Sequence, residues 1–202
     1  MLSVKPKRTI MKRILASAII AISALLAGCH HLTDEDVTAN PTLNTSRSDI
    51  GRGNTIAVKV FNGVDSQQIG LRSSLYEPGY AINLTNDLTP IVNRAVMSTL
   101  QANDFKPVSQ DASRHLTVRL NSLKYQYSNP GSLRSTITIS CSITVEANAE
   151  RDHLKRTYQS KLSYRILTTP TIQSDQNRIN AVLAAALNQM INDAELMHLL
   201  SQ

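Results

Sequence analysis

The sequence lacks most of the features on which disulfide-bonded mini-proteins and integral membrane proteins depend. Its 202 residues include two cysteines and no tryptophan. Two cysteines form at most one disulfide, which excludes a disulfide-rich scaffold. The apolar run at 14–26, which small residues continue to position 29, is shorter than the roughly twenty residues of a membrane-spanning helix, so a polytopic membrane protein is excluded. The 42% apolar fraction excludes a wholly disordered chain.

Acidic residues are absent from the first 33 positions, whereas five basic residues occur there: Lys5, Lys7, Arg8, Lys12 and Arg13. A basic start, a short apolar run and small residues after it are typical of a secretory signal peptide. We therefore predict a signal peptide over residues 1–28. The sequence leaves open whether translation starts at Met1 or at Met11, which also has the surroundings of a natural start.

The last residues of this segment resemble the lipobox of bacterial lipoproteins: Leu26, Ala27, Gly28 and Cys29. In a lipobox the cysteine thiol accepts a diacylglycerol, and the small residues give a peptidase access to the preceding bond. Two or more acyl chains hold a protein stably at a bilayer. We expect this covalent lipid on Cys29 and no other cofactor. The alternative is ordinary secretion with an incidental cysteine.

The residue after Cys29 indicates which membrane holds the protein. In enteric-type bacteria the lipoprotein pattern has Asp at this position for retention in the inner membrane, and this chain has His30. The resemblance therefore implies an outer-membrane anchor with the domain in the periplasm. Cys29, His30 and His31 do not predict a metal site, because an acylated cysteine is no longer a thiolate ligand.

Positive charge is concentrated in the segment that cleavage would remove. The full chain has 21 basic and 15 acidic side chains, and without residues 1–28 it has 16 and 15. The mature protein is therefore almost neutral, and its overall charge does not favour nucleic acid as a partner. Residues 29–54 comprise the lipidated cysteine and a polar stretch that predicts a flexible tether. Residues 55–202 are long enough for a single periplasmic domain.

Alternation of apolar and polar residues predicts the strands of this domain: 56–61, a short return strand at 105–108, 116–127, 136–147 and 154–166. The alternation shifts phase at 121–122, which predicts a β-bulge.

Apolar residues at i, i+3 and i+4 predict two helices, one over 86–102 with Asn86 or Thr89 as its cap and a terminal one capped at Ser174 or Asp175. The order is then β-α-β-β-β-β-α. We predict an α+β fold in two layers, with a largely antiparallel sheet and two helices on one face.

These features together resemble the YajG-type lipoproteins of Gram-negative bacteria. The resemblance rests on the lipobox, the strand at 56–61, the helix at 86–102 that runs into Phe105-Lys106-Pro107-Val108, the strand meander and the terminal helix. It covers essentially the whole mature chain. Because that family is uncharacterised, the resemblance implies a location and a fold rather than an activity.

Catalytic motifs are absent from the sequence, which has no G-x-S-x-G, H-E-x-x-H, P-loop or C-x-x-C. Cys141 lies in the apolar row of a predicted strand, which favours a small core residue over a reactive thiol. We therefore expect no enzymatic activity.

A long loop at 62–81 is the first candidate for function, since long loops in compact domains are often functional. It contains Asp65, Arg72 and Glu77. Asp65 and Glu77 would be the acid/base pair of an envelope hydrolase. A surface excursion without function is the other interpretation.

The polar side of the predicted sheet is the second candidate. It carries hydroxyl side chains between 138 and 144. Four basic residues share this side: Arg119, Lys155, Lys161 and Arg165. Such a face suits an anionic envelope polymer, a lipid headgroup or an envelope protein, although a plain solvated sheet face has a similar composition. It lacks the interleaved aromatics of a single-strand nucleic-acid platform.

These patterns favour a lipid-anchored lipoprotein that acts as a non-catalytic docking module at the outer membrane. Two alternatives remain, an envelope hydrolase or transferase that uses the 62–81 loop and a structural lipoprotein that self-associates. Neither the oligomeric state nor the identity of a partner follows from the sequence.

Overall fold

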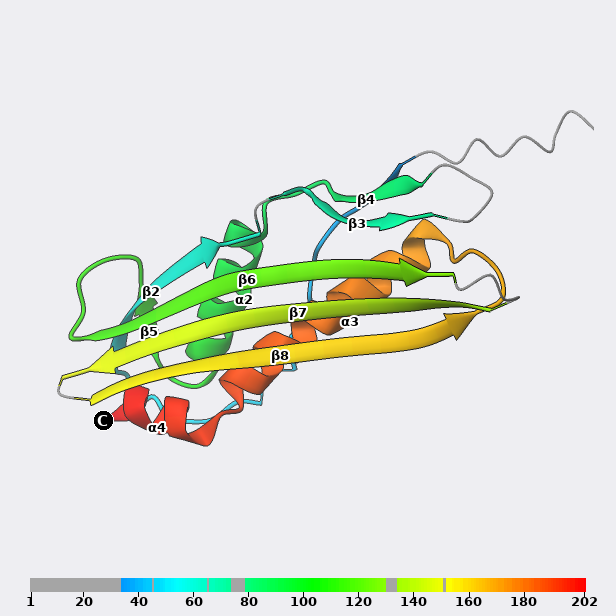
Figure 1. The fold of residues 1–202 in the computed structure, drawn as a ribbon. Coiled ribbons are helices and arrows are strands. Elements are labelled where there is room, and N and C mark those ends of the chain that lie inside the picture. The colour runs from blue at the N-terminus through cyan, green and yellow to red at the C-terminus, as the bar shows by residue number, and fades with distance from the viewer. Residues whose placement is uncertain (1–33, 45, 65, 74–78, 130–133, 151) are drawn as a thin grey trace, which may run out of the picture. The chain divides into compact units, whose positions relative to one another are not determined.

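One twisted sheet carries all the helices of the described residues on one of its faces (Figure 1). The computed structural model describes residues 34–44, 46–64, 66–73, 79–129, 134–150 and 152–202. The elements, in chain order, are β1 (Glu35–Val37), β2 (Thr55–Asn62), β3 (Gln68–Arg72), β4 (Tyr80–Leu84), α2 (Leu88–Ala102), β5 (Lys106–Val108), β6 (Arg114–Ser128), β7 (Ser135–Ala149), β8 (Asp152–Ile166), α3 (Ile172–Ile191) and α4 (Ala194–Ser201).

One side of the sheet is an antiparallel meander of three 15-residue strands, β6, β7 and β8, with β8 at the edge. The other edge of β6 is shared by two strands, because parallel β2 pairs with its first half and parallel β3 with its second half. The register of β6 against β7 shifts between Leu120 and Ser122, so the predicted β-bulge is confirmed. A Cβ atom at Gly70 would lie 2.1 Å from the carbonyl oxygen of Tyr125, so β3 approaches β6 this closely only with glycine there.

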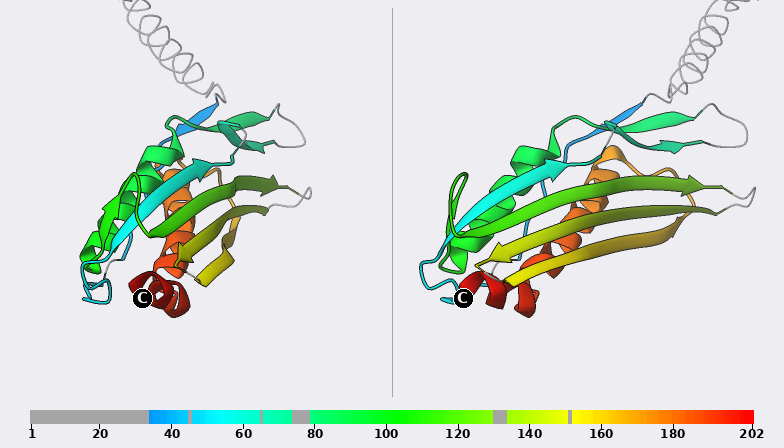
Figure 2. Two further views of the ribbon diagram at one scale, coloured as in Figure 1. Left: turned by 90° about the vertical axis from the view of Figure 1, so that its left-hand side faces the viewer. Right: turned by 60° about the vertical axis from the view of Figure 1, so that its left-hand side comes forward.

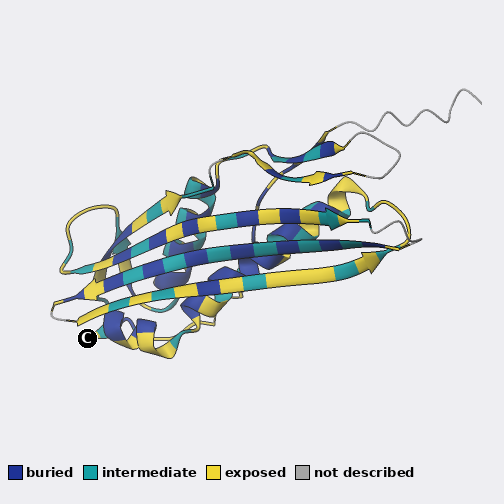
Figure 3. Ribbon diagram, viewed as in Figure 1, coloured by how far each residue is buried: buried dark blue, intermediate teal, exposed yellow. Residues whose placement is uncertain are grey.

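The predicted two-layer α+β architecture is confirmed. Helices α2, α3 and α4 cover one face of the sheet, as Figure 2 shows. Residues of β7 alternate between buried and half-buried along almost its whole length, with Ile137, Ile139 and Ile143 fully buried under the helices (Figure 3). The opposite face of the long strands carries no helix in the described part of the chain.

The prediction of a flexible tether over 30–54 is wrong for its described residues. Residues Glu35–Val37 form a strand parallel to β4, and Val37 and Ala39 are fully buried. Beyond this strand, three backbone N–H groups donate to amide oxygens spaced along one side of α3: Thr38 to Gln176, Asn40 to Asn180 and Asn44 to Asn188. The polar composition suggested a solvated linker, but these amides satisfy the backbone of a packed segment.

The loop predicted at 62–81 is largely a hairpin. Strands β3 and β4 pair antiparallel, and β3 also joins β6, so the sheet contains more strands than the pattern indicated. The predicted terminal helix is two helices, because Asp193 caps α4 immediately after α3 ends at Ile191. Thr171 rather than Ser174 or Asp175 caps α3, and Asp87 rather than Asn86 or Thr89 caps α2.

Candidate functional site

Strand register places the predicted basic residues on the open face of the sheet. On β8, Lys155, Lys161 and Arg165 lie opposite Glu146, Ser140 and Thr136 of β7. All three basic residues are exposed, and they share the polar side of the strand. They form the first of two rows of cations on this face.

The second row lies on β2 and β6, on the other side of β7. Arg119 of this row was predicted, and Lys59 and Lys124 were not. Lys59 pairs in parallel register with Thr117, and Lys124 lies opposite Ser140. Both lysines follow the alternation of their strands, between Val58 and Val60 and between Leu123 and Tyr125. The alternation of apolar and polar residues therefore already indicated that both lysines face this side of the sheet. For Lys124 this holds only because the β-bulge shifts the alternation by one residue.

Between the two rows, β7 presents a column of hydroxyl side chains: Thr136, Thr138, Ser140, Ser142 and Thr144. Some of them link the strands, with hydroxyl contacts of 3.0 Å between Thr138 and Ser163 and 2.9 Å between Thr144 and Thr157. Ser140 lies in register between Lys124 and Lys161. We call the two rows of cations and this column the hydroxyl track.

Opposite charge is scarce on the hydroxyl track. Glu146 pairs with Lys155, and the hydrogen bond and positive charge of that lysine lower the pKa of Glu146. Among the described residues, no ion pair forms with any of four other cations: Lys59, Lys124, Lys161 and Arg165. The guanidinium of Arg119 lies 5.2 Å from the ring centroid of Phe61. The nearly neutral domain is therefore positive on this face.

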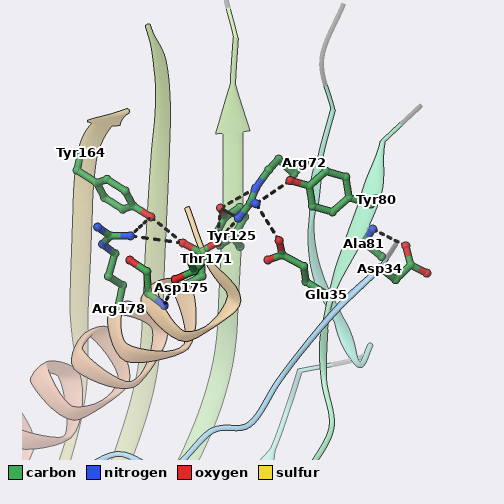
Figure 4. A network of polar contacts seen from close by, with 11 residues as sticks. Asp34, Glu35, Arg72, Tyr80, Ala81, Tyr125, Tyr164, Thr171, Asp175 and Arg178 are labelled. Atoms are coloured by element: carbon green, nitrogen blue, oxygen red, sulfur yellow. Dashed lines mark hydrogen bonds and ion pairs between the residues drawn. The ribbon is translucent and has the colours of Figure 1, made fainter. Parts of the chain in front are cut away.

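Arg72, one of the three residues singled out in the predicted functional loop, lies in a buried polar network at the other face of the sheet (Figure 4). Its side chain is 3% exposed and contacts two carboxylates, Glu35 of β1 at 3.0 Å and Asp175 of α3. It also donates to the hydroxyls of Tyr80 at 2.7 Å and Tyr125 at 2.6 Å. The network thus joins β1, β3, β4, β6 and α3 around one guanidinium.

Burial raises the pKa values of several acidic groups in this network. Burial raises the pKa of Glu35 against the opposing effect of Arg72, and its Oε2 has no hydrogen-bond partner. Burial together with the charge of Asp175 raises the pKa of Tyr164 to about 12 and that of Tyr125 further. Arg72 and Asp175 are closed off from solvent, and their contacts hold β1, β3, β4, β6 and α3 together.

The raised pKa of Glu35 predicts a pH-dependent contribution to stability. Such a carboxyl stabilises the folded state below its unfolded pKa, near 4.5, and loses that contribution as pH rises through the folded pKa. Each pKa unit by which the folded state exceeds the unfolded state corresponds to about 1.4 kcal/mol of unfolding free energy. Urea unfolding between pH 4 and pH 7 should show the wild type losing stability relative to Glu35→Gln as pH rises. If the wild type instead gains stability relative to Glu35→Gln as pH rises, the pairing of Glu35 with Arg72 outweighs the effect of burial on its pKa.

Six of the remaining predicted residues cannot be placed, and Cys141 is the one that can. Leu26, Ala27, Gly28, Cys29, Asp65 and Glu77 lie outside the described residues. Cys141 is buried, and desolvation raises the pKa of its thiol to about 12, which opposes thiolate chemistry. In the described part of the chain, no group of three His, Cys, Asp or Glu side chains is placed to hold a metal ion, and no helix is long and apolar enough to cross a membrane.

A match to a protein family covers most of the molecule. Residues 41–201 match the family described as "Uncharacterized lipoprotein". The chain belongs to this family. The YajG-type resemblance fits it, and the match includes every element from β2 to α4. A comparison with curated proteins finds no match.

Solved structures that match the chain include proteins named as lipoproteins. A Xanthomonas campestris protein has 12% identity and a TM-score of 0.48, over 83% of this chain and 94% of that one. A minor lipoprotein from Acinetobacter baumannii has 9% identity and a TM-score of 0.40, over 73% and 92%. Rare lipoprotein B from Shewanella oneidensis has 12% identity and a TM-score of 0.36, over 69% and 89%.

Proposed function

We propose that this envelope lipoprotein is anchored to the outer membrane through lipid on Cys29 and acts in the periplasm by binding rather than by catalysis. The observation that carries the proposal is the segregation of charge onto the hydroxyl track. Six cations lie on the hydroxyl track, and Glu146 is the single carboxylate that β2, β6, β7 and β8 place on that face in the described residues. A one-sided positive surface attracts anionic partners even when the whole domain is almost neutral.

An anionic polymer of the envelope is the partner that best fits the shape of the hydroxyl track. Strands β6 and β8 flank β7, so the cations on β6 are about 10 Å from the row on β8 at the usual strand spacing. From Lys155 to Arg165 the row on β8 extends roughly 35 Å at about 3.4 Å per residue. Long rows of cations and hydroxyls along the strands suit an extended chain of phosphate- or carboxylate-bearing sugars better than a compact ligand, which would contact only a few of them.

Charge reversal on β8 tests this proposal. The variant Lys161→Glu/Arg165→Glu places two carboxylates beside Ser140 and Thr136. Binding of the purified chain to a phosphorylated outer-membrane polysaccharide should weaken about tenfold, equivalent to about 1.4 kcal/mol. Isothermal titration calorimetry at several salt concentrations measures this loss, and the wild-type affinity should fall as salt increases.

The matched control reverses two exposed charges away from the track, Arg47→Glu/Arg94→Glu. It changes the net charge by the same amount, so it separates a local effect from a global one. Retention of wild-type affinity by the control supports the docking face. Equal weakening in both variants, or no binding by the wild type, overturns the proposal of a polymer-binding face.

A further inference from the structure

The connection between β8 and α3 exposes large apolar side chains at both of its ends. Leu167 is 75% exposed and Ile172, the first residue of α3, is 47% exposed. Leu167 is the most exposed of the large apolar residues in the described part of the chain. Residues 166–174 contain no acidic side chain, and the exposed Arg165 immediately precedes them. We call Arg165 and residues 167–172 the apolar tip.

The beginning of the described chain lies at the same end of the domain as the apolar tip. Arg72 contacts both Glu35 of β1 and Asp175, which is three residues from Ile172. The segment after β1 then follows α3 from Gln176 towards Asn188, so the chain enters beside the first turn of that helix. In Figure 1 the start of β1 and the first turn of α3 lie at the same end of the sheet.

The chain length before β1 limits how far this end is from a lipid on Cys29. Asp34 follows Cys29 by five residues, and a chain of that length spans at most about 18 Å. Resting on the lipid anchor proposed above, we propose that the apolar tip contacts the bilayer surface, with Leu167 and Ile172 in the headgroup region and Arg165 at lipid phosphates.

A bilayer suits the apolar tip better than a soluble partner because the anchor keeps it close. A tether of this length gives the second contact a high effective concentration, so weak apolar contacts suffice. Apolar side chains beside basic ones are the combination with which interfacial segments bind anionic bilayers. Contact through the tip would direct the long axis of β8 away from the membrane and expose the rest of the hydroxyl track, from Lys155 to Lys161 on β8, to the periplasm, while Arg165 lies at the membrane end.

Fluorescence quenching tests the contact directly, because the sequence has no tryptophan to interfere. The probe is the lipidated full-length mature chain with Leu167→Trp, in vesicles of phosphatidylethanolamine and phosphatidylglycerol that contain brominated lipid. The control is His153→Trp, an exposed position at the opposite end of β8. Interfacial segments lie about 5–10 Å deep. Bromine near the headgroups should therefore quench the Leu167→Trp probe several-fold more than the His153→Trp control, and more than bromine deep in the acyl chains does.

Vesicle flotation separates the two parts of the account. If the protein floats with the vesicles and the indole of the probe is quenched no more than that of the control, the anchor holds and the tip contact is wrong. A blue-shifted probe emission without quenching by bromine would show burial against protein and would also overturn the contact. If the lipidated chain does not float with the vesicles, the anchor itself fails and the inference fails with it.

Discussion

Asp175→Asn should destabilise the domain by about 3–5 kcal/mol, the cost of breaking a buried ion pair by removing one partner. The Asp175 side chain is fully buried and serves four partners: Arg72, Tyr125, Tyr164 and Arg178. Asparagine keeps the size of the side chain and removes its charge, so Arg72 retains Glu35 as its only carboxylate in the described network. Urea unfolding of the chain from residue 30 onward, followed by circular dichroism, measures the loss.

The matched control for this substitution is Asp36→Asn, on the exposed side of β1 beside the network. A surface change of this kind should stay within about 0.5 kcal/mol of the wild type. A double-mutant cycle of Arg72→Ala and Asp175→Ala adds a second test, because residues in one network couple by about 0.5–3 kcal/mol. The double variant should therefore cost less than the sum of the single ones. A loss below about 1 kcal/mol in Asp175→Asn, or strict additivity, would contradict the role of the network.

The strongly periodic parts of the chain were predictable from the sequence. Alternation in β7 identified its buried side, and the change of phase in β6 located the bulge, because burial of one sheet face constrains every second residue. The spacing of Val92, Val96 and Leu100 similarly predicted the buried side of α2. These elements are long, and their own residues carry the signal.

The missed elements depend on partners far away in the sequence. Strand β1 has three residues, two of them acidic, and Glu35 is buried only because Arg72 lies 37 positions later. Strands β3 and β4 are five residues each, too short for a clear alternation. The apolar stripe continues from Met190 across Asp193 to Leu196, which concealed the break between α3 and α4.

The candidate site was predictable only where its residues lie on a single regular strand. Lys155, Lys161 and Arg165 share one side of a single regular strand, so their common face followed from alternation. Lys59 belongs to that face only through the parallel pairing of β2 with β6, which the sequence does not specify. Arg72 was assigned to a functional loop because a charged residue in a long loop looks exposed, whereas its four partners come from other elements.

The lipid on Cys29 is the claim on which the anchor, the membrane-facing tip and the presentation of the hydroxyl track all depend. Incorporation of radiolabelled palmitate in cells, with membrane fractionation, tests it most directly in the wild type, Cys29→Ala and Cys141→Ala. We expect Cys29→Ala to lose the label completely and to leave the membrane fraction. Cys141→Ala should keep both, because that thiol is buried in the sheet. Palmitate incorporation that survives Cys29→Ala would contradict the account.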